Sequence, residues 1–376
     1  MGVADDIARV ELDALRARGL LRALEPLRSP AGAEIELRPG ERLINLSSND
    51  YLGLAGDARI AAALAEGAAR WGAGAAASRL VTGNFLPQHE LENELASFEG
   101  TEAALLFNSG YAANCALVPA FVGPEDLVLS DALNHASIID ACRLSRARVE
   151  IYPHVDVGAA EHLLREIPAR RKLVVTDSIF SMDGDRAPLR ELSEVCARHG
   201  AMLAVDEAHA TGVLAEKMPA DLRMATHSKA LGVAGAHVAG TRAVCDLLLN
   251  RARPLIFSTA LPPAIACAVL KSLQIVRGPE GDERRARLWR NVARFAEGLR
   301  SLGLPARANS PIFPLVLGTP DKALGVASRL RELGVLAKAI RPPTVPAGTS
   351  RIRFALTAAH TDAHVDAAFS ALRTAC

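Results

Sequence analysis

The middle of the chain alternates short apolar runs with segments of helical periodicity. The runs at 102–110, 126–132, 171–180, 201–209 and 236–240 predict strands, because their apolar residues are nearly continuous. Between them, LPQHELENELASFEG and PLRELSEVCARHG space apolar residues by three and four and end at glycine, which predicts helices. Strands that are buried on both faces and alternate with helices predict an α/β fold with a mostly parallel sheet. In such sheets ligands bind beyond the carboxyl ends of the strands.

The two ends of the chain show different patterns. The first 44 residues predict an amphipathic helix followed by a strand pair around AEIELRPGERLINL. Residues 261–278 predict a long helix that Pro262 and Pro263 open and Gly278 ends, and 282–303 predict another. A smaller α/β unit then follows, with strands at 311–318, near 335–340 and at 350–358, and helices at 319–334, capped by Thr319, and 361–374. We therefore predict three parts: an N-terminal segment over 1–44, a large ligand-binding domain over 45–255, and the long helix with a small C-terminal domain over 256–376.

Composition and charge exclude several classes of protein. Half of the 376 residues are hydrophobic and 23% are charged, so the chain can bury a large core, which must be mainly aliphatic because only 4% of residues are aromatic. The net charge of +1, with both signs interspersed, gives no electrostatic footprint for nucleic acid or an anionic membrane. The apolar stretch over 103–123 is interrupted by Asn108, Ser109 and Asn114, so it is too polar to span a bilayer.

The cysteines and the N-terminus indicate the compartment. The six cysteines are Cys115, Cys142, Cys196, Cys245, Cys267 and Cys376; they form no C-x-x-C pair and lie in no histidine cluster. This spacing argues against a zinc site and against a disulfide framework. The first residues lack the basic flank and apolar core of a signal peptide. The sequence predicts a cytoplasmic protein without a metal and with neither a nucleic-acid nor a membrane partner.

The segment VDEAH places an acid and an imidazole at the end of an apolar run. Asp206 follows AMLAV, His209 comes three residues later, and Lys229 follows one loop further on, within the Gly/Ala-rich stretch ATHSKALGVAGAHVAG. A lone aspartate in this place is more often a helix cap or an arginine partner, but the three together are much rarer. Helicases also carry an Asp-Glu-Ala-His box, yet they need a phosphate loop, and the dipeptide Gly-Lys occurs nowhere in this chain.

The surroundings of Lys229 suit pyridoxal phosphate (PLP). A lysine amine held among small residues has its pKa lowered by desolvation and can form a Schiff base. PLP also needs an aspartate, such as Asp206, that keeps its ring nitrogen protonated. The small residues around Lys229 would leave room for the cofactor. The alternative is a structural lysine whose amine reaches solvent from a glycine-rich turn.

Other polar residues could complete such a site. Ser109, Gly110 and Tyr111 precede a helical stretch, and free amides at a helix start bind phosphate. His135 in LNHASIID could lie flat on a pyridine ring, or be an ordinary loop histidine. Arg353 alternates with Arg351 on the strand SRIRFAL, and one of them could hold a substrate carboxylate, or both could be charges of an edge strand.

Taken together, these motifs identify a family. The chain resembles the α-oxoamine synthases, PLP-dependent enzymes of the aspartate-aminotransferase fold (fold type I), over nearly its whole length. The segments that carry the resemblance are LSSNDYLGL (46–54), GAGAAASRLVTGN (72–84), FNSGYAAN (107–114), NHAS (134–137), DSIFSMDGD (177–185), VDEAHATG (205–212), THSKALG (226–232), FSTALPP (257–263) and RPPTVPAGTSRIR (341–353). The resemblance implies a large domain with a mostly parallel sheet, a smaller C-terminal α/β domain, and a homodimer.

The resemblance assigns roles by position. It implies that Lys229 forms the Schiff base and acts as general base, that Asp206 binds the pyridinium nitrogen, and that His135 stacks on the ring and assists condensation. The remaining cofactor contacts that it implies are His209 and Ser181 near the phenolic oxygen, Gly110, Tyr111 and Thr226 near the phosphate, and Ser258 with Thr259, which reach a phosphate across the dimer interface. For the substrates it implies Arg353 and Asn49 at the amino-acid carboxylate, and Thr344 and Arg22 at the acyl group.

The last segment indicates which reaction of the family applies. It is most similar to the branch of the family that condenses L-alanine with a pimeloyl thioester, on CoA or a carrier protein, in biotin biosynthesis. The alternative is a relative of the glycine C-acetyltransferase or 5-aminolevulinate synthase type, which joins glycine to an acetyl or succinyl thioester. One departure concerns the stretch between His209 and Lys229, which lacks the Gly-rich loop expected after TGV. We expect this difference to affect how the acyl substrate reaches the site.

Overall fold

A computed structural model describes residues 2–375, and these residues form two compact units. The first unit contains the chain up to Tyr51, the short segment Met182–Gly184 and the chain from Ala286 onward. The second contains Leu52–Ser181 and Asp185–Arg285. Cys376, one of the six cysteines considered above, lies outside the described residues.

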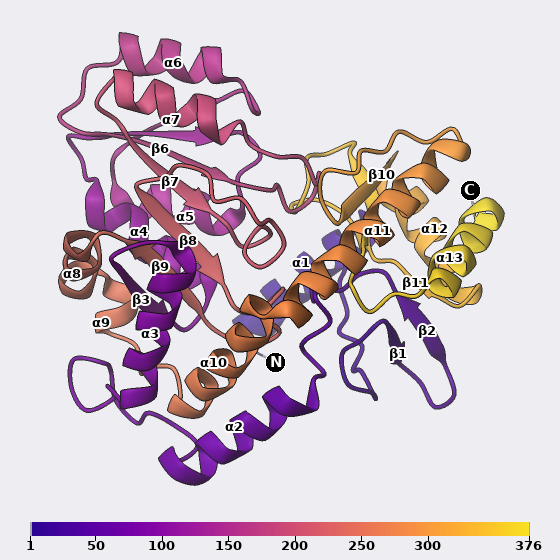
Figure 1. Ribbon diagram of the computed structural model, residues 1–376. Coiled ribbons are helices and arrows are strands. Elements are labelled where there is room, and N and C mark those ends of the chain that lie inside the picture. The colour runs from indigo at the N-terminus through magenta and orange to yellow at the C-terminus, as the bar shows by residue number, and fades with distance from the viewer. Residues whose placement is uncertain (1, 376) are drawn as a thin grey trace. The chain divides into compact units, whose positions relative to one another are not determined.

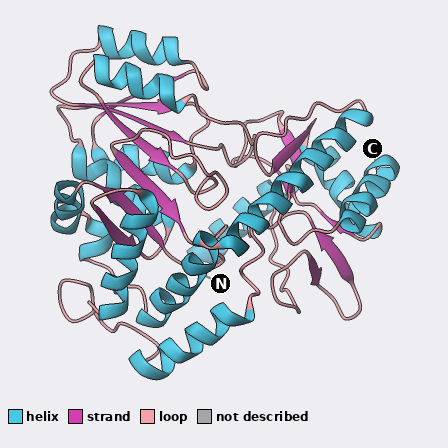
Figure 2. Cartoon of the chain, viewed as in Figure 1, coloured by secondary structure: helices cyan, strands magenta, loops and turns pink. Residues whose placement is uncertain are grey.

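The second unit is built on a sheet that, within residues 2–375, has seven strands in the order β3-β9-β8-β7-β6-β4-β5 (Figure 2). Neighbouring strands from β8 to β5 run parallel, and β9 is antiparallel to both β8 and β3. The bounds are β3 Ala103–Phe107, β4 Leu127–Asp131, β5 Arg148–Tyr152, β6 Lys172–Asp177, β7 Met202–Asp206, β8 Leu222–Thr226 and β9 Ala236–Gly240. The predicted α/β class with a mostly parallel sheet is confirmed.

Helices cover both faces of this sheet, as the sequence pattern requires. Figure 1 shows α6 and α7 on one face and α4, α5, α8 and α9 on the other. Their bounds are α4 Gly110–Phe121, α5 Ala136–Ser145, α6 Val157–Glu166, α7 Leu189–Arg198, α8 Arg242–Arg251 and α9 Arg253–Ile256. Successive strand residues point to opposite faces, so Val174 packs under α6 and α7 while Val175 packs under α4 and α5.

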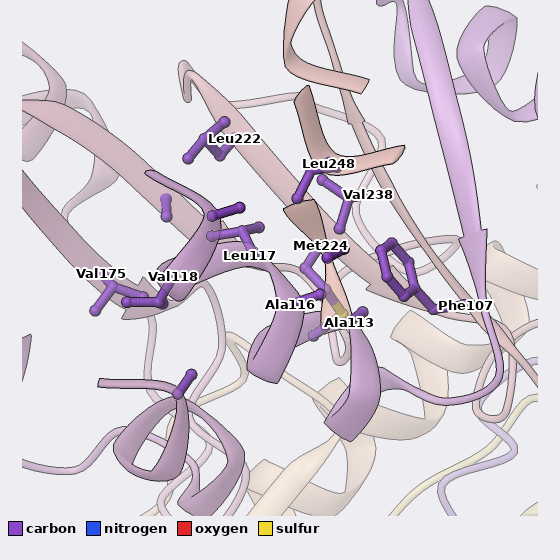
Figure 3. Close-up of a cluster of buried hydrophobic side chains, with 14 of the residues drawn as sticks. Phe107, Ala113, Ala116, Leu117, Val118, Val175, Leu222, Met224, Val238 and Leu248 are labelled. Carbon is purple, nitrogen blue, oxygen red and sulfur yellow. The ribbon is translucent and has the colours of Figure 1, made fainter. Parts of the chain in front are cut away.

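The core on the α4 side positions the start of that helix. Leu117 of α4 and Leu248 of α8 pack on Val175, Met224 and Val238 of three strands, all at most 3% exposed (Figure 3). Burying a side chain of this size stabilises the fold by roughly 1.5–3 kcal/mol. The packing therefore fixes the first residues of α4 beside the carboxyl ends of the parallel strands.

The second unit also contains α2 (Ala58–Trp71), α3 (Leu86–Glu99) and α10 (Pro263–Arg277), and α10 packs on both of the other helices. A side chain at Gly67 of α2 would place its Cβ only 2.9 Å from the Cα of Ala264 in α10. Glycine at this position lets the two helices approach closely. The predicted helix over 261–278 is thus confirmed, with Pro262 as its N-cap.

The first unit contains two small sheets. In residues 2–375, β1 (Glu34–Glu36), β2 (Arg42–Asn45) and β11 (Val335–Leu336) form one, and β10 (Ile312–Gly318), β13 (Ser350–Ala355) and β12 (Ala339–Ile340) the other. Its helices are α1 Val3–Ala17, most of α11 Pro279–Ser301, α12 Pro320–Glu332 and α13 Asp362–Ala375. Thr319 caps α12, as predicted, by accepting a hydrogen bond from the backbone N–H of Lys322.

The structure adds two strands that the sequence pattern did not predict. β5 lies at the edge of the large sheet and is half polar, and β8 carries Arg223 although it is buried. Arg223 is 8% exposed and forms an ion pair with Glu207 at 2.5 Å. The segment over 335–340, predicted as one strand, instead supplies β11 and β12 to different sheets.

Candidate active site

The carboxyl ends of β6, β7 and β8 bring together the residues that the sequence singled out. Asp206 ends β7, and it is in register with Asp177 at the end of β6. Thr226 ends the neighbouring strand β8, and Lys229 follows three residues later, partly buried. The acid and the lysine therefore lie at or just beyond the carboxyl ends of adjacent strands, at the edge of the sheet where α/β proteins bind ligands.

Both oxygens of the Asp206 carboxylate are held in place. Asn114 of α4 donates a hydrogen bond to Oδ2 at 2.8 Å, and the backbone N–H of Ala208 donates to Oδ1 at 2.8 Å. Asp206 is 4% exposed and Asn114 is 3% exposed. The sequence analysis did not single out Asn114 for the site, although it lies in the segment FNSGYAAN that carried the family resemblance.

A second carboxyl group, that of Asp177, is fully buried beside Asp206. Burial raises the pKa of Asp177 well above its ordinary value, and the charge of Asp206 raises it further. The ammonium of Lys229 acts on the same group in the opposite direction, which places all three in one electrostatic neighbourhood. A proton on Asp177 would remove the repulsion between the neighbouring carboxyl groups.

His135 is connected to Asp206 through a chain of hydrogen bonds. It is the N-cap of α5, and its Nδ1 lies 2.7 Å from Oγ of Ser137 and accepts a hydrogen bond from the Ser137 backbone N–H. Oγ of Ser137 in turn accepts from Asn114, at 2.9 Å, which also binds Asp206. Protein packed on the inner side of the ring lowers the pKa of His135, although the residue itself is exposed. An exposed, neutral ring in a fixed orientation suits stacking.

The start of α4 forms a cradle for an anion. Ser109 is the N-cap, and Gly110 and Tyr111 are the first helical residues, whose backbone N–H groups have no partner within the helix. A Cβ at Gly110 would lie 3.6 Å from Cβ of Thr226. The hydroxyl of Thr226 is 2.8 Å from that of Ser228, a further residue that the sequence analysis did not single out.

Two more predicted residues lie beside this helix start. Asn108 donates hydrogen bonds to Oγ of Ser258 at 3.1 Å and to the carbonyl oxygen of Thr259 at 2.8 Å. Since Asn108 directly precedes Ser109, the structure fixes Ser258 and Thr259 next to the start of α4. The phenol of Tyr111 donates a hydrogen bond to Asp140 of α5.

Ser181 and His209 come from the loops after β6 and β7. His209 is 5% exposed, and Ser181 is partly buried. Ser181 lies within a hairpin-like return in which the Phe180 N–H donates to the carbonyl of Asp185 at 3.0 Å. Ser178, at the base of this loop, donates through N and Oγ to the carbonyl of Asp206 at 2.8 and 3.0 Å.

His154 fixes the base of the same loop between two carboxylates. Its Nδ1 is 2.8 Å from Asp131 and its Nε2 is 2.6 Å from Asp185, so both nitrogens must carry protons. Burial alone would lower the pKa of His154, but the hydrogen bonds to Asp131 and Asp185 raise it to about 10. Val155 has a φ of +53°, a strained conformation that the hydrogen bond from its N–H to Asp131 helps to hold.

We predict that His154→Gln makes stability less dependent on pH. A group whose pKa is higher in the folded state stabilises that state fully below its unfolded pKa and loses this effect as pH rises through its folded pKa. The difference in free energy of unfolding between the wild type and the variant should therefore be largest below pH 6.5 and vanish above about pH 10. Denaturant unfolding at several pH values measures it. His162→Gln, at an exposed position of α6, is the control. A pH-independent difference for His154→Gln would contradict a charged His154 held between Asp131 and Asp185.

The four predicted substrate residues belong to the first unit. Arg353 of β13 donates to the phenol of Tyr51 at 3.5 Å, and this phenol donates to Oδ1 of Asn49 at 3.3 Å. Arg22 donates to Oγ1 of Thr344 at 3.4 Å. The structure thus brings the four together in two pairs, Arg353 with Asn49 and Arg22 with Thr344.

The neighbouring arginine Arg351, which the sequence left as an alternative to Arg353, forms an ion pair with Asp183 at 2.5 Å. Because Arg351 already binds a carboxylate of the protein, it is the weaker candidate for a substrate carboxylate.

The residues of the second unit fit PLP. A helix start with free N–H groups and adjacent hydroxyls suits a phosphate, a fixed carboxylate suits a pyridinium N–H, and a lysine on the next strand suits a Schiff base. Among residues 2–375, no group of three or more His, Cys, Asp or Glu side chains is placed to hold a metal ion. Within the same range, no helix is long and apolar enough to cross a bilayer.

Comparisons with known proteins agree with this site. The profile of the aminotransferase class I and II family matches residues 41–372. The chain is 54% identical to an 8-amino-7-oxononanoate synthase of Anaeromyxobacter dehalogenans strain 2CP-1, with 96% of this chain and 93% of the relative covered.

Solved structures of two related enzymes share this fold. The structure of a serine palmitoyltransferase from S. paucimobilis with a bound PLP–myriocin aldimine has a TM-score of 0.92 at 29% identity, covering 100% of this chain and 98% of that chain. An 8-amino-7-oxononanoate synthase from Francisella tularensis has a TM-score of 0.75 at 27% identity, covering 88% and 97%.

Fold and site therefore define a PLP-dependent enzyme of aminotransferase fold type I, an acyltransferase of the α-oxoamine synthase class. Within that class, the chain belongs to the family of the 8-amino-7-oxononanoate synthases.

Proposed function

We propose that the protein joins L-alanine to a pimeloyl thioester, with loss of CO2 and release of the free thiol, in biotin biosynthesis. The product is 8-amino-7-oxononanoate, and the acyl carrier is CoA or an acyl carrier protein. The observation that carries this proposal is the geometry at the strand ends, where Lys229 lies beside an anchored Asp206 whose hydrogen-bond chain extends to His135. This arrangement suits the formation of a carbanion at the α-carbon of an amino acid. The transfer of an acyl group to that carbon is inferred from the family to which the chain belongs.

PLP, when bound, supplies an electron sink for the carbanion at the alanine α-carbon. The Asp206 carboxylate would accept a hydrogen bond from the ring N–H and keep that nitrogen protonated. Asn114 and the Ala208 N–H hold the carboxylate in the required direction, so it needs no reorganisation during the reaction. Gly110, Tyr111, Thr226 and, from a second copy of the chain, Ser258 with Thr259 bind the phosphate.

Lys229 moves the proton. Its amine would remove the α-proton of alanine and later return a proton to the product. His135 packs on the ring and donates to the carbonyl oxygen of the thioester during condensation. His209 and Ser181 bind the phenolic oxygen. Arg353 and Asn49 bind the carboxylate of alanine.

We propose that Arg22 and Thr344 recognise the distal carboxylate of the pimeloyl group. Arg22 already points to the Thr344 segment, where it donates to the carbonyl oxygen of Pro342 at 3.3 Å and to Oγ1 of Thr344 at 3.4 Å. Both bonds are long and Arg22 is exposed, so its guanidinium can exchange them for a stronger bond to a carboxylate.

The prediction for Arg22→Met concerns acyl choice. A hydrogen bond to a charged group contributes about 1.5–3 kcal/mol, so kcat/KM for the pimeloyl thioester should fall roughly 10- to 100-fold. Turnover of an octanoyl thioester, which lacks the distal carboxylate, should be slow in the wild type and unchanged in the variant. Arg28→Met, in the same exposed N-terminal segment, is the matched control.

Rates of thiol release with the two thioesters measure the effect. Equal losses with pimeloyl and octanoyl substrates would contradict carboxylate recognition by Arg22. A clear preference for glycine with acetyl-CoA or succinyl-CoA would instead assign the protein to a glycine-using branch of the family.

We also propose a homodimer. Its support is the exposure of large apolar side chains: Phe257, next to Ser258 in the chain, is 71% exposed, and Val81 and Leu80 are 72% and 53% exposed. Phe257 directly precedes Ser258 and Thr259, so covering it with a second copy would carry these hydroxyls to that copy's phosphate. The mass of the protein in solution by light scattering tests this proposal.

A further inference from the structure

A cluster of ionisable side chains lies buried beside the turn that carries Lys229. Glu99, the last residue of α3, is 4% exposed, and His227 after β8 and His237 in β9 are both 0% exposed. Ionisable groups are seldom buried this completely unless they are paired. None of the three takes part in the chemistry described above, so their presence needs another explanation.

The three side chains form a continuous relay. Nε2 of His227 lies 3.1 Å from Nδ1 of His237, and Nε2 of His237 lies 3.4 Å from Oε1 of Glu99. The other oxygen of Glu99 accepts a hydrogen bond from Nζ of Lys217 at 2.5 Å. The chain of contacts therefore runs from a partly exposed lysine to an imidazole in the interior.

His227 attaches this relay to the turn over residues 227–235. Its backbone N–H donates to the carbonyl of Gly235 at 2.9 Å, and its carbonyl accepts from Val233 at 3.0 Å. Within the turn, the N–H of Gly232 donates to the carbonyl of Lys229 at 2.9 Å. These bonds make Lys229 part of a closed turn whose two ends are joined through His227.

The imidazole of His227 also sets the shape of the turn. Gly235 has a φ of +112°, and a Cβ at this position would lie only 2.9 Å from Nδ1 of His227. The ring thus packs directly on the backbone of Gly235, which only glycine permits. A shift of the ring would therefore move the turn, and Lys229 with it.

The protonation states make the relay costly to break. Burial alone would raise the pKa of Glu99, but the adjacent His237 and the charge of Lys217 lower it to about 2. Burial lowers the pKa of His227 well below its ordinary value, so this ring is neutral. Oε1 of the Glu99 carboxylate can then act only as an acceptor, and Nε2 of His237 faces it at 3.4 Å. An apolar residue in place of His227 would leave Nδ1 of His237 without its partner in the interior.

We propose that His227 is a positioning residue, which acts through His237 and Glu99 to fix the turn 227–235 and thereby the direction in which Lys229 presents its amine. The same cluster holds the residue after Asp206, because Glu207 pairs with Arg223 at 2.5 Å and lies 3.7 Å from Lys217. The proposal rests on the role of Lys229 in the proposed function.

The test compares His227→Phe with His360→Phe in the protein carrying its cofactor. His360 is also buried, at 4% exposure, and its Nε2 lies 3.1 Å from the carbonyl oxygen of Asn45 in the first unit. Both variants lose the hydrogen bonds of a buried histidine, so both should melt at a lower temperature. The decisive readout is the midpoint pH at which the visible absorbance of the bound cofactor changes, because this midpoint depends on the placement of the lysine nitrogen.

We expect the midpoint to move by at least about half a pH unit in His227→Phe, and not in His360→Phe. The kcat of His227→Phe should fall on the order of tenfold to a hundredfold because the amine is misplaced, while the KM for alanine stays near the wild-type value. In His227→Gln the amide can donate to His237. Both the midpoint and kcat of this variant should therefore stay close to the wild-type values.

Should His227→Phe fail to fold, Glu99→Gln and His227→Gln test the relay instead. Glu99→Gln should shift the midpoint, since the carboxylate that orients His237 is gone, and His227→Gln should stay near the wild type. A wild-type midpoint in His227→Phe, or in Glu99→Gln, would show that the relay is only structural and overturn the proposal. Borohydride reduction followed by peptide mapping separates this result from failure of the proposed function, in which a lysine other than Lys229 would be labelled.

Discussion

Replacing Lys229 by alanine should abolish turnover and the covalent link between protein and cofactor. Lys229 follows β8 beside Asp206 and, in the proposed function, both holds PLP and moves the α-proton. General acid–base catalysis alone contributes about 10²- to 10⁴-fold, and the variant also loses the amine that exchanges with the substrate, so kcat should fall by at least about 10⁴-fold. Steady-state thiol release and the visible absorbance of the purified protein measure the two effects.

Lys271→Ala is the matched control for this variant. Lys271 lies on α10 in the same unit and is partly buried like Lys229. It should retain its colour, its activity and its borohydride labelling at Lys229. Substantial activity in Lys229→Ala, or labelling of another lysine in the wild type, would show that the site is assigned to the wrong residue.

The second large effect is expected for Asp206→Asn. The amide has nearly the same shape, so the cofactor should still bind, but an amide does not keep the ring nitrogen protonated. Removing a preorganised electrostatic group from an active site commonly costs about 10²- to 10³-fold in kcat, and we expect a loss of this size. The absorbance of this variant should therefore show a normal cofactor content, while its kcat for thiol release is reduced.

Asp156→Asn provides a comparison outside the site. Asp156 caps α6, where its carboxylate accepts a hydrogen bond from the Ala159 N–H at 2.9 Å, and asparagine caps a helix about as well, so this substitution should leave turnover unchanged. Near-normal turnover in Asp206→Asn would mean that Asp206 serves only to fix the loop after β7.

Much of the fold could be predicted because its strands are buried on both faces. Such strands are continuous apolar runs, and β4, β6 and β7 were found on this basis. β8 was not, because Arg223 interrupts its apolar pattern. An arginine is acceptable there because it forms a buried ion pair with Glu207, and this partner lies 16 positions away in the sequence. β5 was missed because Arg148 and Glu150 interrupt its apolar run, as polar residues can in a strand at the edge of a sheet.

The site could be predicted where its residues end strands or belong to compact motifs. Asp206 and Lys229 stand out because a carboxylate and a lysine follow buried strands. Asn114 did not, because a single asparagine in an Ala-rich helix is not part of any recognisable motif. Its partners Asp206 and Ser137 are known only once α4 is packed on the sheet. The contacts of His237 with His227 and Glu99 likewise depend on three elements that meet only in the fold.

The central claim is a decarboxylative condensation, and the direct measurement is the stoichiometry of its products. L-alanine labelled with ¹³C in the carboxyl group would be mixed with the protein and pimeloyl-CoA, and released ¹³CO2, free thiol and amino ketone would be quantified together. The account predicts equal amounts of all three, with none formed by Lys229→Ala. An aminotransferase would instead form pyruvate without releasing thiol, and a simple decarboxylase would release CO2 without thiol; either result would contradict the account.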